Sequence, residues 1–69
     1  MSVVKKLVGE SKSGVRLEAV IVKNDGAPYS IRYYVDNNFK TEIVCHDESL
    51  ALVEKHAEEW LGGIEPLNG

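Results

Sequence analysis

Cysteine, proline and aromatic residues are scarce in this chain, which has one, two and five of them among 69 residues. The single cysteine, Cys45, has no partner for an internal disulfide, which is typical of proteins in a reducing compartment. The chain also lacks an apolar run long enough for a signal peptide or a membrane span. We therefore expect a cytoplasmic protein that does not engage a membrane.

The chain is also too short for a large hydrophobic core. Its 69 residues fit a single domain, which we assign to residues 1–69. A domain of this size buries only about 60% of the surface of its unfolded chain, and it usually needs a disulfide, a metal or a partner subunit for stability. With no disulfide available, the length favours self-association.

Charge is unevenly distributed around a net value of −3. Residues 1–46 carry seven Lys or Arg and five acidic residues, whereas residues 47–61 carry five acidic residues and one lysine. Such asymmetry bears on association with other molecules and not on the fold. The net acidic character makes nucleic acid an unfavoured partner.

Apolar periodicity predicts four strands followed by one helix. Alternating and β-branched runs indicate strands at Val3–Val8, Val15–Asn24, Tyr29–Asp36 and Phe39–His46. From Leu50 the period becomes helical, with Val53, Ala57, Trp60 and Leu61 on one stripe. We expect a helix over Glu48–Leu61, with Asp47 as its N-cap and Glu48 in its first turn. The fold class is α+β: a four-stranded antiparallel meander (β-β-β-β-α) with one C-terminal helix packed on one sheet face.

The parity of the apolar residues predicts the strand register. A three-residue loop at 36–38, with Asn38 in the left-handed conformation, opposes Val35 with Phe39 and Ile31 with Ile43. The odd-numbered residues then face the helix, and the even-numbered residues form the opposite sheet face. One lysine of the Lys5-Lys6 pair points inward in either register of the first strand. A lysine on an edge strand disfavours edge-to-edge pairing with another chain.

The stretch IVCHDE, residues 43–48, places a cysteine, a histidine and two carboxylates in a row. Consecutive strand residues point to opposite faces, so we expect Cys45 to be buried and unreactive and His46 to face solvent. A metal or catalytic site needs groups that converge on one point, and these diverge. Gly9–Gly14 has the spacing of a phosphate-binding loop but precedes a strand and lacks the required Lys-Ser/Thr. We assign no catalytic, cofactor-binding or metal-binding residues, no cofactor and no enzymatic activity.

The even face carries the strongest functional signal, an apolar patch that the predicted helix does not cover. We expect an interface there, with Arg32 and Glu42 paired inside it. Its members are Val20, Val22, Arg32, Tyr34, Glu42 and Val44. The leading hypothesis is a small non-enzymatic protein-interaction domain that forms a homodimer, through this face or an edge strand, and acts as an accessory or modulator protein. The size of the chain suggests a bacterial or phage origin.

Two alternatives belong to other functional classes. The first is a nucleic-acid-binding module that uses the even sheet face, with Arg16, Arg32, Tyr34 and Lys40, assisted by Lys23. The second is an enzyme or metal protein built around Cys45, His46 and His56 at a subunit interface. The dependence of binding on salt concentration distinguishes the first alternative from the leading hypothesis, because nucleic-acid affinity falls steeply as the salt concentration rises.

Overall fold

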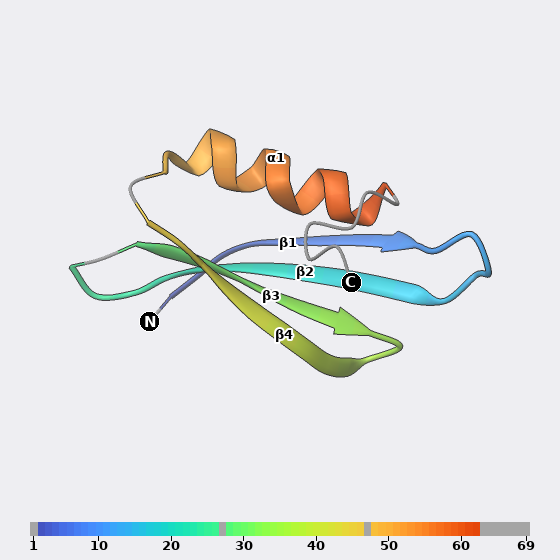
Figure 1. The fold of residues 1–69 in the computed structure, drawn as a ribbon. Helices are drawn as coiled ribbons and strands as arrows, with labels where there is room; N and C mark the ends of the chain where they lie inside the picture. Colours follow the sequence, from blue (N-terminus) through green and yellow to red (C-terminus); the bar gives the residue numbers. More distant parts are fainter. Residues whose placement is uncertain (1, 27, 47, 63–69) are drawn as a thin grey trace.

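A computed structural model describes residues 2–26, 28–46 and 48–62, and these residues form one sheet and one helix (Figure 1). The strands are β1 (Ser2–Glu10), β2 (Arg16–Lys23), β3 (Tyr29–Val35) and β4 (Asn38–Cys45), and the helix is α1 (Leu50–Leu61). The sheet is open and antiparallel with the order β1-β2-β3-β4. The predicted α+β fold with a C-terminal helix on one sheet face is therefore confirmed.

The core lies between the apolar stripe of α1 and one face of the sheet. The helix packs against β1, β2 and β3, and Val53, Ala57 and Trp60 are its buried residues, as the helical period predicts. The ring of Trp60 lies 4.4 Å from that of Tyr33 at an angle of 49°. This single layer of contacts is the hydrophobic core of the described residues.

The helix begins two residues later than predicted. Ser49 is the N-cap, and its side chain accepts a hydrogen bond from the backbone N–H of Leu52. The assignment of Asp47 as N-cap is therefore wrong, and Asp47 itself lies outside the described residues. Glu48 precedes the helix and is not in its first turn. Serine is as good an N-cap as aspartate, so the residue types alone do not separate the two positions.

The β3–β4 hairpin also differs from the prediction. Its turn has two residues, Asp36 (φ 53°) and Asn37 (φ 67°), and Val35 pairs with Asn38. Two left-handed residues in succession give the type I′ turn, whose twist matches that of the flanking strands. The predicted left-handed residue, Asn38, is instead the first residue of β4.

A β-bulge follows this turn and restores the predicted pairing farther along the hairpin. Tyr34 pairs with Phe39 and Tyr33 with Thr41, so Lys40 is the additional residue. Ile31 then opposes Ile43, as predicted. The bulge changes the faces of two residues: Phe39 joins the even-numbered face, and Lys40 lies on the helix side, where it lines a pocket with Trp60.

Strand β1 is an edge strand with its own irregularity at Val4, between Val3 and Lys5. Lys5 turns toward the helix, with its Nζ 3.5 Å from Oε1 of Glu54. Lys6 turns to the other face, with its Nζ 4.0 Å from Oε2 of Glu18. Within the described part of the chain, no helix has the length and apolar composition needed to cross a lipid bilayer.

Candidate functional site

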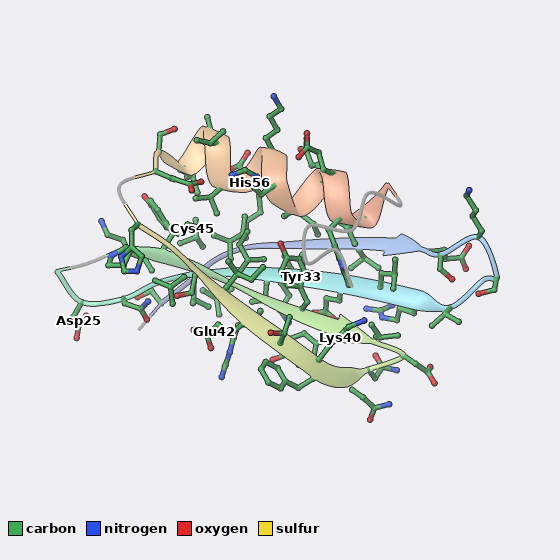
Figure 2. The ribbon with its side chains drawn as sticks, viewed as in Figure 1. Asp25, Tyr33, Lys40, Glu42, Cys45 and His56 are labelled. Carbon is green, nitrogen blue, oxygen red and sulfur yellow. The ribbon has the colours of Figure 1, made fainter. Side chains whose placement is uncertain are left out.

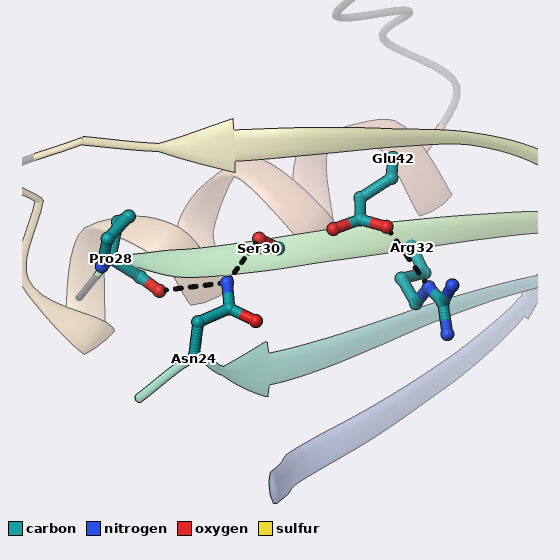
Figure 3. A network of polar contacts seen from close by, with 5 residues as sticks. All are labelled: Asn24, Pro28, Ser30, Arg32 and Glu42. Atoms are coloured by element: carbon teal, nitrogen blue, oxygen red, sulfur yellow. Dashed lines mark hydrogen bonds and ion pairs between the residues drawn. The ribbon is translucent and has the colours of Figure 1, made fainter. Parts of the chain in front are cut away.

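The sheet surface opposite α1 is called the open face here. Strand pairing arranges its side chains in three cross-strand rows. The rows, read from β1 to β4, are Val8–Glu18–Tyr34–Phe39, Lys6–Val20–Arg32–Glu42 and Val3–Val22–Ser30–Val44. Figure 3 views this face with the helix behind the sheet, and Arg32 and Glu42 project toward the viewer.

Apolar exposure on the open face is concentrated on its two edge strands. On β1, Val3 is 60% exposed and Val8 is 54% exposed; on β4, Phe39 is 55% exposed and Val44 is 45% exposed. Single exposed apolar residues are common, but four large ones on one face of a small domain form a candidate contact surface.

The central strand β2 contributes less exposed apolar surface than the sequence indicates. Val20 and Val22 are only 7% and 2% exposed. They lie in a shallow groove of about 340 Å³ that Lys6, Glu18 and Arg32 also line. Long side chains on neighbouring strands cover apolar surface with their aliphatic stems, so a valine on an uncovered sheet face is still removed from water.

The charged groups of the open face are paired with one another. The Nε of Arg32 donates to Oε1 of Glu42 at 3.2 Å, in the predicted cross-strand pair. Glu18 lies between two cations, with Lys6 at 4.0 Å and Arg16 at 3.6 Å. These three cations and two carboxylates therefore each have an opposite charge within 4.0 Å.

Phe39 is the main feature of this face that the sequence analysis missed. Its ring lies 5.8 Å from that of Tyr34 in an edge arrangement, and the guanidinium of Arg32 lies 5.7 Å from its centroid. The signal for it was present in Asp36-Asn37, since both residue types tolerate the left-handed conformation of a two-residue turn. With that turn, Phe39 is opposite Tyr34.

Polar groups of the open face beside the β2–β3 turn form hydrogen bonds with one another. Ser30 is fully buried, and its hydroxyl accepts a hydrogen bond of 2.9 Å from Nδ2 of Asn24. The same amide donates to the carbonyl of Pro28 at 3.2 Å and so closes the β2–β3 turn (Figure 3). A buried hydroxyl with a partner adds stability and offers no free group for a ligand.

The residues of IVCHDE point apart, as predicted for the described part of that stretch. Cys45 is 4% exposed, and burial, followed by the negative charge of Glu48, raises the pKa of its thiol. His46 is exposed. His56 lies on the helix, with its Nε2 2.9 Å from Oε1 of Glu48 (Figure 2 labels Cys45 and His56). Among the described residues, no three metal-ligating groups converge.

The residues considered for nucleic-acid binding are divided between the two faces. Arg16, Arg32 and Tyr34 lie on the open face, as predicted. Lys40 does not, because the bulge turns it to the helix side. Lys23 shares its row with Tyr29 and Cys45, and its Nζ lies 5.8 Å from the ring of Tyr29.

Comparisons with protein-family models, with curated proteins and with solved structures gave no match.

Proposed function

We propose that the protein is a non-enzymatic interaction domain that forms a homodimer through the open face of its sheet. The observation that carries the proposal is the exposure of Val3, Val8, Phe39 and Val44 on that face. A thin core and the lack of an internal disulfide add a reason for a partner, because small domains gain much of their stability from association. We place the protein in the cytoplasm, because a single free cysteine such as Cys45 is typical of a reducing compartment.

The dimensions and charges of the open face suit a second copy of the chain. The molecule measures 38 × 19 × 19 Å, so one long face offers about 700 Å², near the roughly 800 Å² per partner of a standard interface. The Arg32–Glu42 pair is already made within one protomer. When two such faces meet, Arg32 and Glu42 are therefore buried as a pair, whereas burial of either charge alone would be strongly unfavourable.

Sedimentation velocity at micromolar concentration tests the proposal, with the wild-type chain expected to sediment as a dimer. Phe39→Glu and Val44→Glu should each produce a monomer, because each inserts a charge into the proposed interface. Both side chains are about half exposed in the protomer, so the substitutions leave the protomer core intact. Val22→Glu is unsuitable, since Val22 is buried within the protomer.

Leu52→Glu is the matched control. Leu52 is 41% exposed on the helix, away from the open face, so this variant should remain dimeric. A wild-type chain that sediments as a monomer, or a Leu52→Glu variant that dissociates as readily as Phe39→Glu, contradicts the proposal.

Nucleic-acid binding is the second candidate, favoured by the Phe39 ring beside Tyr34 on the open face. Stacking on exposed rings is a common mode of single-strand recognition. Against it, the cations Lys6, Arg16 and Arg32 each have an acidic partner within 4.0 Å. Binding of a labelled single-stranded oligonucleotide that weakens steeply with salt would favour this candidate over the dimer.

A further inference from the structure

An open pocket of about 480 Å³ lies on the helix side of the sheet, where the C-terminal end of α1 approaches the β1–β2 loop and the β3–β4 hairpin. Its apolar lining residues are Leu17, Val35 and Trp60. Its polar lining residues come from the loop, as Ser11, Lys12 and Ser13, and from the bulge, as Lys40. The volume falls within the range of small-molecule sites.

The loop that forms one side of this pocket has a defined conformation. The N–H of Ser11 donates to the carbonyl of Val15, and the N–H of Gly14 donates to the carbonyl of Ser11, both at 2.9 Å. The hydroxyl of Ser11 accepts from the N–H of Val15 at 3.1 Å. Gly14 has φ +84°, which glycine adopts without strain. Lys12 is therefore presented on an ordered turn.

Among the described residues that line the pocket, the charged ones are both lysines. Lys12 and Lys40 line it, and its described lining residues include no Asp or Glu. Neither lysine has an ion-pair partner among the described residues, in contrast to the paired cations of the open face. Lys40 is there only because the bulge turns it to this side, and bulges that re-aim side chains are common beside functional sites.

We infer that this pocket binds a small amphipathic carboxylate. The apolar body of the ligand lies against Leu17, Val35 and Trp60, and its carboxylate lies between the ammonium groups of Lys12 and Lys40. Charge-assisted hydrogen bonds at the rim of an apolar site orient such a ligand and select its charge. The inference does not rest on the proposed dimer, whose surface is the opposite face of the sheet.

Decanoate is the probe, and Trp60 is the reporter because it is the only tryptophan in the chain. Titration of the full chain with decanoate should change the Trp60 emission in a saturable manner. Decyltrimethylammonium, with the same apolar chain and the opposite charge, should bind more weakly. In the Lys12→Ala/Lys40→Ala double variant, decanoate affinity should fall by about tenfold, the effect of losing charge-assisted contacts.

Lys55→Ala is the matched control, since Lys55 is an exposed lysine of α1 that does not line the pocket, and it should leave the affinity unchanged. Amide chemical shifts should change around residues 11–17 and 40. The inference is overturned by equal binding of the two probes, by an unaltered affinity in the double variant, or by shift changes confined to the open face. Sedimentation of the same samples reports separately on the dimer.

Discussion

Two adjacent residues, Asp36 and Asn37, decide the composition of the open face. Both have positive φ, a conformation that costs a non-glycine residue on the order of 1 kcal/mol or more. Their turn brings Phe39 opposite Tyr34 and makes Lys40 the additional residue of the bulge. The exposed ring on one face and the lysine in the pocket on the other therefore share one local cause.

This turn conformation predicts that glycine has opposite effects on stability at the neighbouring positions Asn37 and Asn38. Asn37→Gly should be neutral or stabilising by up to about 1 kcal/mol, because glycine adopts φ 67° without strain. Asn38→Gly should instead be destabilising by roughly 0.5–1 kcal/mol, because Asn38 is a strand residue. Urea unfolding measures both. Asn37→Val should cost about 1 kcal/mol or more, and a tolerated valine would show that the turn is assigned wrongly.

The buried phenol of Tyr33 makes the stability of the fold depend on pH in the alkaline range. Burial, with a smaller contribution from the charge of Cys45, raises the pKa of its phenol from 10.0 to about 12. In the unfolded chain the phenol ionises first, so stability is complete below about pH 10 and falls as the pH rises toward 12. The loss reaches at most about 2–3 kcal/mol.

Unfolding experiments between about pH 9 and 12 measure this loss. The decrease in unfolding free energy should be clearly smaller in Tyr33→Phe, which has no ionisable group at this position. Tyr34→Phe, on the open face, should retain the full decrease due to Tyr33. Equal pH profiles for the wild type and Tyr33→Phe would mean that burial of the phenol does not govern the alkaline transition.

At the scale of elements, α1 begins where Ser49 satisfies a free backbone N–H group. The hydroxyl of Ser49 lies 3.3 Å from the backbone nitrogen of Leu52. Ser49→Ala should therefore destabilise the protein by about 1 kcal/mol, whereas Ser49→Asp should be neutral or stabilising because aspartate caps as well and its charge favours the helix N-terminus. Thermal unfolding compares the two. Equal melting temperatures would place the cap elsewhere.

The helix and the hairpin divide the sheet into two unlike surfaces. The face beneath α1 is occupied by Val53, Ala57 and Trp60, whereas the open face has no helix among the described residues to cover it. Its exposed apolar groups lie on β1 and β4, the two edge strands, whereas Val20 and Val22 of β2 are buried. A partner that covers the open face therefore contacts mainly the two edges.

At the scale of the whole molecule, the proposed dimer links stability to concentration. A partner that binds only the folded protomer raises the apparent stability by mass action. The melting temperature of the wild type should therefore rise with protein concentration, while that of Phe39→Glu should be lower and independent of concentration. A wild-type melting temperature that stays constant over a hundredfold dilution would contradict self-association.

The sequence by itself determined the order of the elements and the orientation of most core residues. Period-two and helical patterns are local, so they located four strands and the stripe of Val53, Ala57 and Trp60. The parity of the apolar residues also predicted the pairing of Ile31 with Ile43 and the burial of Cys45, because side-chain direction alternates along a strand. The structure confirms both.

Only the tertiary structure decided which residues the molecule presents to partners. The two-residue turn and the bulge exchange the expected faces of Phe39 and Lys40, and parity cannot detect a bulge that restores the register within three residues. Val20 and Val22 are buried although they face away from the helix, in a groove that they share with long side chains of neighbouring strands. Asp36 and Asn37 permit the two-residue turn, but the twist and pairing of the flanking strands select it, and the burial of a strand residue depends on its neighbours across the sheet.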